Sequence, residues 1–258
     1  MMNTDWRTQL VQRQRWMLYL LPFVVYSLAG SLEPTPGHPG GEAIKLSIPY
    51  AYYPWMYTAK IALTVAAVAL VWPGYRQFPR RVTLLAIVVG VAGGPLWIAL
   101  CQLDFEHKYL FPLLNHVGLG WVIGAGERPA FNPFDLKNEL PPEGAWAFLA
   151  VRFFGLVAVV PLVEEFFLRG FVMRFVMEWD WWNVPFGKAD RFAIVLGTAV
   201  PMLMHPGELL AAAVWFSLIT WLMLKTRTIW DCVAAHGLTN LILGIYVVLH
   251  GEEAWRLL

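Results

Sequence analysis

Charged residues are scarce in this chain, and their signs nearly cancel. Asp, Glu, Lys and Arg make up 14% of its 258 residues, and the formal net charge is +1. A nearly neutral chain has little electrostatic attraction for a phosphate backbone, so we do not expect nucleic acid as a partner. Cysteine is also rare. Cys101 and Cys232 lie in or beside apolar runs and form neither a disulfide framework nor a zinc-ligand spacing.

Hydrophobic residues are abundant instead, at 58% of the chain. A soluble domain of this size has too little interior to bury so many, so the composition predicts a polytopic helical protein embedded in the lipid bilayer. Most of the 14 tryptophans lie at the ends of apolar runs, as in the interfacial belts of such proteins. The first apolar run has no small-residue cleavage site, and we interpret it as a retained anchor.

The predicted fold is all-α, a transmembrane helical bundle of about seven spans in a single membrane-embedded domain, residues 1–258. The apolar runs that predict these spans are Trp16–Leu32, Trp55–Trp72, Val82–Leu103, Ala145–Met177, Phe192–Met204, Glu208–Leu224 and Ile229–Leu249. An eighth span is possible at Tyr109–Gly124. That run is short and contains Pro112, so we expect an interfacial or re-entrant segment there. The proline-rich stretch Glu127–Gly144 is predicted to be a loop on the outer side.

The basic residues indicate an orientation. Ten of them lie on one side of the seven-span arrangement: Arg7, Arg13, Arg15, Arg76, Arg80, Arg81, Lys188, Arg191, Lys225 and Arg227. The positive-inside rule then places the N-terminus in the cytoplasm, and we expect a multi-pass protein of a bacterial inner membrane. An eighth span at Tyr109 would move the last four of these residues to the opposite side.

Three ionisable residues interrupt the fourth apolar run. Charged groups cost a few kcal/mol each in hydrocarbon, so they rarely lie there without a use. Glu165 and Arg169 are four residues apart on one helix face, with the acid N-terminal to the base, which favours an ion pair. Glu164 is rotated by about 100° from its neighbour and is left to face something else. Pro161 is expected to kink or unwind the helix just before the two acids. A buried structural ion pair with a spare acid is the alternative.

Two histidines and an amide complete a candidate hydrolytic site. His205 ends the fifth span, whereas His236 and Asn240 lie within the seventh, four residues apart and therefore on one face. A glutamate can take a proton from water, and an imidazole and an amide can donate to a developing oxyanion. His107, His116 and His250 lie near span ends, where an interfacial role is the commoner one.

These residues resemble a known family. EEFFLR, Glu164 to Arg169, is similar to the E-E-x-x-x-R motif of the CAAX-protease and bacteriocin-processing intramembrane proteases, the CPBP or Abi family. HGLTN, His236 to Asn240, is similar to their H-x-x-x-[ND] motif, and His205 stands where their F-x-x-x-H motif would end.

The likeness extends over about residues 145–249, so we predict a protease core at 145–250 in the last four helices, preceded by N-terminal spans and an outer loop at 1–144. Pro201 replaces the phenylalanine of the second motif, which affects the expected shape of the fifth helix. VPLVEEFFLRGFVMRF, VPFG and HGLTNLILGIYVV also look like the subgroup that accompanies bacterial exosortase protein-sorting systems.

The resemblance implies a role for each residue. Glu164 would be the base that activates water, and Glu165 with Arg169 would be the structural pair that supports it. His205 would share or orient the water, and His236 with Asn240 would hold the oxyanion. The implied activity is that of an intramembrane endopeptidase that hydrolyses a peptide bond of a membrane-associated polypeptide.

Other interpretations use the same residues. A non-catalytic membrane scaffold or immunity protein would keep the fold, and a transporter could use a proton-coupled glutamate. A zinc-dependent version of the protease would use Glu164, His205 and His236 as ligands. We favour an enzyme without a metal cofactor, because zinc would take Glu164 as a ligand and leave no obvious base. The fifth and seventh spans also contain no acid that could support such histidines.

The seven-span arrangement has one geometric difficulty. It places His205 near the outer end of its helix, whereas His236 lies about 10 Å from the inner face at 1.5 Å per residue. The two imidazoles can share a site only if the fifth helix is strongly tilted or starts with an unwound, shallow segment.

Overall fold

A computed structural model describes residues 5–35, 39–41, 44–119 and 140–250, and in these ranges the chain is helical apart from turns and one isolated antiparallel bridge between Gly40 and Ile48. The all-α prediction is therefore confirmed for the described residues. The N-terminal helices are α1 (Trp6–Arg13), α2 (Met17–Gly30), η2 (Tyr50–Tyr52), α3 (Tyr53–Tyr75), α4 (Leu84–Gln102), η3 (Glu106–Leu110) and α5 (Phe111–His116). The C-terminal helices are α7 (Pro142–Phe154), η4 (Gly155–Val159), α8 (Val160–Glu165), η5 (Phe166–Val172), α9 (Met173–Phe175), η6 (Trp181–Asn183), α10 (Arg191–Leu203), α11 (Leu209–Thr226) and α12 (Ile229–His250).

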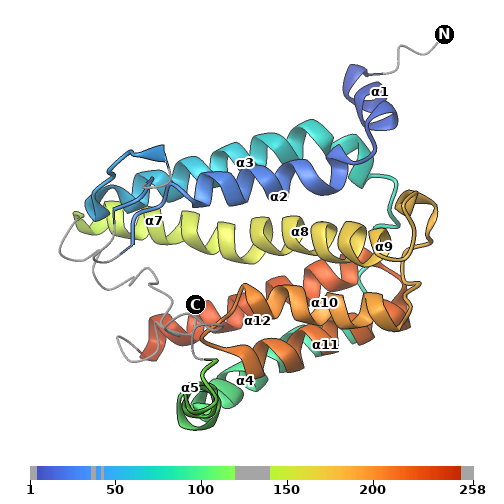
Figure 1. The fold of residues 1–258 in the computed structure, drawn as a ribbon. Helices are drawn as coiled ribbons and strands as arrows, with labels where there is room; N and C mark the ends of the chain where they lie inside the picture. The colour runs from blue at the N-terminus through green and yellow to red at the C-terminus, as the bar shows by residue number, and fades with distance from the viewer. Residues whose placement is uncertain (1–4, 36–38, 42–43, 120–139, 251–258) are drawn as a thin grey trace.

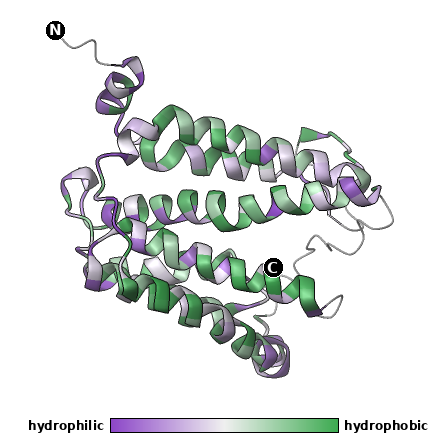
Figure 2. Ribbon diagram, turned by 180° about the vertical axis from the view of Figure 1, so that it is seen from behind, coloured by the Kyte–Doolittle hydropathy of each residue, from purple (hydrophilic) through white to green (hydrophobic). Residues whose placement is uncertain are grey.

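The helices run side by side in alternating directions. Helices α2 and α3 pack against each other, and α4 packs against α12. Between these pairs lies the long helix from α7 to α9, while α10 and α11 extend the side formed by α4 and α12 (Figure 1). Hydrophobic residues cover most of the helical surface, and hydrophilic ones gather towards the connections (Figure 2). This distribution suits a bundle that is surrounded by lipid.

Within the described residues, five helices are long and apolar enough to cross a membrane by length and composition: Tyr50–Tyr75, Leu84–His116, Pro142–Phe175, Leu209–Thr226 and Ile229–His250. The protein is thus an integral membrane protein with several candidate spans. The other two predicted spans correspond to α2 and α10, which have 14 and 13 residues and are shorter than the roughly 20 that a perpendicular span needs. Seven complete spans therefore remain a prediction.

The segment between α4 and the long helix is only partly described. Asp104 has a positive φ of 52°, and η3 and α5 follow it with five and six residues. Neither is long enough to cross the membrane alone, in line with the expected interfacial segment. Most of the predicted outer loop, namely its residues 127–139, lies outside the described residues, as do residues 120–124 of the possible eighth span. The predicted end of this loop, Gly144, is wrong, because α7 starts at Pro142 and Gly144 is helical.

Pro161 changes the register of the long helix rather than unwinding it. Residues 142–175 are continuously helical, with π-helical turns in η4 and η5. In η4 the Val160 N–H donates to the Gly155 carbonyl, five residues back. The Leu156 carbonyl would then face the nitrogen of Pro161, which has no hydrogen. This register therefore leaves the Leu156 carbonyl without its helical donor immediately before the two glutamates.

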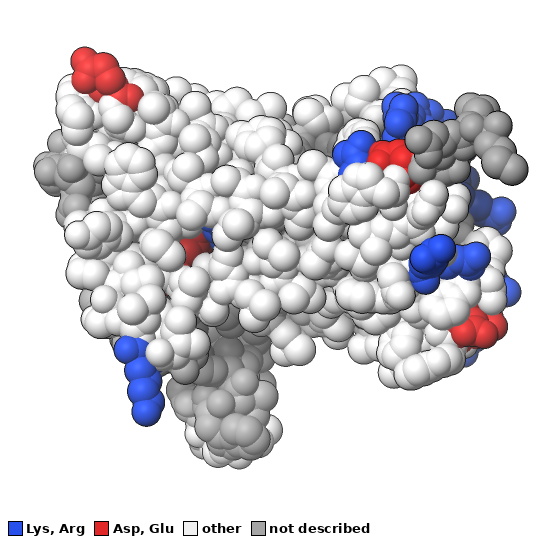
Figure 3. All heavy atoms as spheres, turned by 90° about the horizontal axis from the view of Figure 1, so that it is seen from above, with Lys and Arg blue, Asp and Glu red and all other residues white. Residues whose placement is uncertain are grey.

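The two ends of the bundle differ in charge. On the face shown in Figure 3, Lys and Arg gather mainly at the end that carries α1. The alternating helices bring to that end the start of α2, the end of α3, the α9–α10 connection and the α11–α12 connection. Together with α1, which carries Arg7 and Arg13, these segments contain the ten basic residues named above.

Candidate active site

Glu165 is completely buried and is held from two sides. Its Oε2 lies 3.2 Å from Arg169 Nε, and its Oε1 lies 3.0 Å from His236 Nδ1. The Glu165 and Arg169 side chains are both completely buried. The predicted ion pair is therefore present, although its alignment does not meet hydrogen-bond geometry. Arg169 also donates from Nη2 to the Phe216 carbonyl, at 3.3 Å. The pair thus ties the long helix to α11 and α12.

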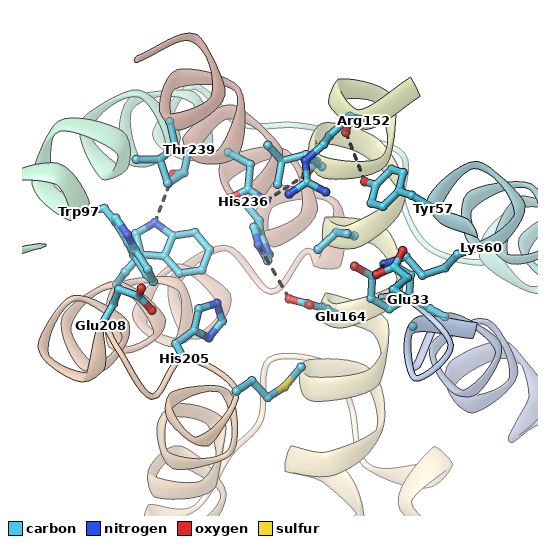
Figure 4. A pocket seen from close by; sticks show the side chains of 18 of the residues that line it. Glu33, Tyr57, Lys60, Trp97, Arg152, Glu164, His205, Glu208, His236 and Thr239 are labelled. Carbon is cyan, nitrogen blue, oxygen red and sulfur yellow. Dashed lines mark hydrogen bonds and ion pairs between the residues drawn. The ribbon is translucent and has the colours of Figure 1, made fainter. Parts of the chain in front are cut away.

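His236 lies between the two glutamates. Its Nδ1 contacts Glu165, and its Nε2 lies 4.0 Å from Glu164 Oε2, which is too long for a direct hydrogen bond. Figure 4 shows the Glu164 and His236 side chains pointing toward each other. The Glu164 side chain is 11% exposed, whereas that of Glu165 is 0% exposed. The acid predicted to face something else therefore faces His236 and the cavity.

The contact with Glu165 decides what His236 can do chemically. An ionised carboxylate only accepts, so Nδ1 carries a proton in this contact. Nε2 can then accept a proton from a neighbour, or it can donate to an oxyanion when the ring carries both protons. A ring fixed by a carboxylate behind it needs no reorientation during a reaction.

His205 follows the end of α10 and turns back onto it. Its Nδ1 lies 2.8 Å from the Pro201 carbonyl, which can only accept, so the hydrogen lies on Nδ1. The ring packs against Trp97 and Phe216, with centroid separations of 5.6 and 5.5 Å. Pro201, which departs from the family motif, thus supplies the carbonyl that orients the histidine.

His205 lies just beyond the end of α10, as expected, but this helix is shorter than a full span. With 13 residues this helix is about 20 Å long, well short of the bilayer core. It starts at the same end of the bundle as α12, in which His236 lies about 10 Å from the helix start. Phe216 packs against both imidazole rings, with centroid separations of 5.5 Å to His205 and 6.3 Å to His236, so the two histidines lie near each other.

Asn240 makes a contact that the sequence did not predict. Its Nδ2 donates to the Leu156 carbonyl at 2.9 Å. This is the carbonyl that the π register and Pro161 leave without a helical donor. The amide nitrogen has two hydrogens, so one can hold the backbone while the other is directed to a ligand.

A cavity of about 380 Å³ brings these groups together. Glu164, His205, His236 and Asn240, the four predicted catalytic residues, all belong to its lining, and Glu165 and Arg169 lie outside it. Figure 4 shows the labelled members on several different helices around one space. The four residues thus line one cavity, and their catalytic roles stay a prediction.

Close helix packing supports the His236 ring. A Cβ added to Gly90 of α4 would lie 2.8 Å from the Ala235 carbonyl, so glycine allows α4 to approach α12. Thr239 then donates to the Gly90 carbonyl at 3.0 Å and accepts from Trp215 Nε1 at 3.2 Å. The Trp215 ring packs against His236 with a centroid separation of 4.7 Å.

The cavity also contains charged residues that the sequence reasoning missed. Lys60 of α3, Arg152 of α7 and Glu33, which follows α2, are part of its lining. Lys60 and Arg152 lie inside apolar runs, so the signal that singled out Glu164 could have found them. Glu33 lies in a loop, where an acid is ordinary, and nothing in the sequence marks it.

The residues proposed as zinc ligands fit a metal only in part. Each histidine has Nδ1 on an acceptor, Glu165 or the Pro201 carbonyl, as metal-bound histidines do. The acid that supports His236 is Glu165 of the long helix, so the absence of such an acid from the fifth and seventh spans does not argue against zinc at His236. Yet among the described residues no group of three or more His, Cys, Asp or Glu side chains is close enough to hold a metal ion. Glu164, His205 and His236 therefore do not form a metal-binding centre among the described residues.

A polar cavity between membrane-spanning helices, with a carboxylate, two imidazoles and an amide in its lining, has the features of an intramembrane hydrolase. Residues 146–242 match the model of the family described as type II CAAX prenyl endopeptidase Rce1-like. This segment is less than half of the chain, and it is similar to a domain of that family, whose members are proteases. No curated protein matches the chain, and no solved structure matches it.

Proposed function

We propose that this protein is an intramembrane endopeptidase that uses Glu164 to activate water. The observation that supports this most is the pair formed by Glu164 and His236, which face each other at 4.0 Å on the cavity wall. Behind them, Glu165 and Arg169 fix the imidazole in a fully buried ion pair. The family match includes these residues, and because the family consists of endopeptidases, it supports a polypeptide as the substrate.

The proposed reaction follows from the donors and acceptors around the cavity. Glu164 takes a proton from water, and the resulting hydroxide attacks the scissile carbonyl carbon. The carbonyl oxygen becomes an oxyanion that accepts from His236 Nε2–H and from the second hydrogen of Asn240 Nδ2. His205 orients the water through Nε2. Glu164 then returns its proton to the leaving nitrogen as the C–N bond breaks, which gives a carboxylic acid and an amine.

The experiment is proteolysis by the purified full chain in liposomes. A pool of membrane-inserting peptides, each made with and without a prenyl group, is incubated with the protein, and mass spectrometry identifies new termini. We expect cleavage of a subset by the wild-type protein. A folded protein that cleaves no member of the pool would favour the scaffold interpretation.

We also propose an orientation and a domain organisation. The end of the bundle with the basic connections would face the cytoplasm, as in a bacterial inner-membrane protein. The chain would act as one membrane-embedded domain, since α2, α3 and the helices of the family-matched segment all contribute residues to one cavity. Membership in the exosortase-associated subgroup remains a prediction from the sequence, because the family match does not extend to it.

Replacing Asn240 with alanine is expected to lower turnover by about 10²–10³-fold with nearly unchanged substrate affinity, because one oxyanion donor is lost. The variant also leaves the Leu156 carbonyl without its donor, at a cost of about 1–3 kcal/mol of stability. Steady-state kinetics and thermal melts measure the two effects. Normal turnover with weak binding would assign Asn240 to substrate recognition instead.

Exhaustive chelation is expected to leave activity unchanged, because a metal bound to Glu164 would occupy the proposed base while Glu165 is held by Arg169 and His236. Elemental analysis of active protein accompanies the assay. Stoichiometric zinc, with activity lost on chelation and restored by zinc, would replace this mechanism with a metal-dependent one on the same helices.

A further inference from the structure

The cavity has a second wall that the proposed chemistry does not use. Lys60, Tyr53 and Tyr57 of α3, Arg152 of α7 and Glu33 line it, and Figure 4 shows Arg152, Tyr57, Lys60 and Glu33 around the same space as Glu164 and His236. All but Arg152 precede the family-matched segment, residues 146–242. The groups on this wall are therefore largely separate from the motifs of the proposed chemistry.

The two cations on this wall have different surroundings. Lys60 Nζ forms an ion pair with Glu33 Oε2 at 2.8 Å and lies over the rings of Tyr26 and Tyr57, at 4.4 and 4.7 Å. Arg152 Nη1 donates to the Tyr53 hydroxyl at 2.7 Å, and its guanidinium carbon lies 5.0 Å from the centre of the Tyr57 ring. The wall thus carries two cations and one acid, Glu33. Two further carboxylates line the cavity: Figure 4 shows Glu164 between His236 and Lys60, and Glu208 near His205 and Trp97.

Arg152 and Glu164 lie on the same face of one helix. Arg152, Leu156, Val160 and Glu164 follow one another at intervals of four, and all four line the cavity. Twelve residues at 1.5 Å correspond to about 18 Å along the axis. An extended peptide advances about 3.3–3.6 Å per residue, so a substrate along this face covers that distance with about five residues.

We propose that Arg152 binds a carboxylate of the substrate, so that the protein selects polypeptides with an anionic group within about five residues of the scissile bond. A guanidinium matches a carboxylate with two parallel hydrogen bonds, and the tyrosines hold it over the cavity. Lys60, fixed by Glu33, adds positive potential beside it. This inference rests on the proposed function. The carboxylate is either the C-terminus of the substrate or an Asp or Glu side chain.

The probe is one 12-residue fluorescent peptide with an apolar C-terminal half, taken from a cleaved sequence where one exists. It is made with a free C-terminus, with a C-terminal amide, and with an amide plus glutamate at one of the last five positions. We expect the wild-type protein to bind and cleave a carboxylate form about 10- to 100-fold better than the plain amide, as for hydrogen bonds to charged groups. The form that is preferred identifies the source of the carboxylate.

Arg152→Gln is expected to remove this preference by weakening the carboxylate form alone, and Arg152→Lys to retain part of it. Arg76→Gln, at an exposed site after α3, is the matched control and should keep the full preference. Binding is measured separately on Glu164→Gln protein, so a failure of catalysis is distinguished from a failure of recognition. Two results would overturn the proposal. One is that Glu164→Gln protein binds the carboxylate and amide peptides with equal affinity. The other is that Arg152→Gln weakens the binding of the carboxylate and amide peptides by the same factor. The wild-type comparison needs no variant, so it holds even if Arg152→Gln does not fold.

Discussion

Glutamine in place of Glu165 is expected to destabilise the protein by about 3–5 kcal/mol, the cost of leaving one partner of a buried ion pair uncompensated. The glutamine would remove the negative charge that Arg169 and His236 share, and the Glu165 and Arg169 side chains have no access to solvent. The guanidinium would remain buried beside the Phe216 carbonyl without its counter-ion. Activity should fall as well, because His236 loses the group that orients it.

Glu164→Gln is the matched control for this measurement, since it changes the adjacent residue in the same way. The Glu164 side chain reaches the cavity, so its replacement should lower the melting temperature much less. Thermal melts of both variants in one detergent give the comparison. Equal losses of stability would mean that the two acids do not divide the structural and chemical roles as described.

Glu164→Gln itself is expected to abolish detectable proteolysis, because it removes the proposed base; general-base catalysis alone contributes about 10²–10⁴-fold. The amide is close in size and cannot take a proton from water. Glu143→Gln is the control, since Glu143 is exposed in the first turn of α7 of the same long helix. Steady-state turnover at equal concentrations of folded protein measures the effect. Turnover within a few-fold of wild type for Glu164→Gln would assign the base elsewhere.

The sequence predicted the helices well because lipid imposes a strong pattern. The predicted fifth span, Phe192–Met204, agrees within one residue with α10, and the seventh, Ile229–Leu249, with α12. Long apolar runs with charged residues at their ends indicate where a helix leaves the hydrocarbon core of the bilayer. The same pattern does not reveal depth or tilt, and for that reason His205 was expected too far from His236.

The sequence identified the polar pairs on one helix but not those between helices. Glu165 and Arg169 are four residues apart, so helical geometry alone predicts their contact. The contact of Glu165 with His236 joins residues 71 positions apart and depends on how the long helix packs against α12. For this reason the acid that supports His236 was sought on the fifth and seventh spans, where it does not lie.

The backbone around Pro161 shows a second limit. A proline within a helix predicts a disturbed hydrogen-bond pattern, but not whether the helix bends, unwinds or widens. Here it widens into π turns, and the Leu156 carbonyl is served by Asn240 from another helix. The position of Asn240 in the site is therefore coupled to the backbone that precedes Glu164, which spacing within either motif does not show.

The measurement that tests the central claim most directly is the incorporation of ¹⁸O from labelled water into a cleaved peptide. Wild-type and Glu164→Gln proteins, purified in parallel and reconstituted at equal concentration, are incubated with the same peptide in H₂¹⁸O. If Glu164 activates water in the cavity, mass spectrometry should find ¹⁸O in the new C-terminal carboxyl group of the wild-type product and no product from Glu164→Gln. Equal amounts of labelled product from both proteins would contradict the assignment of Glu164 as the base.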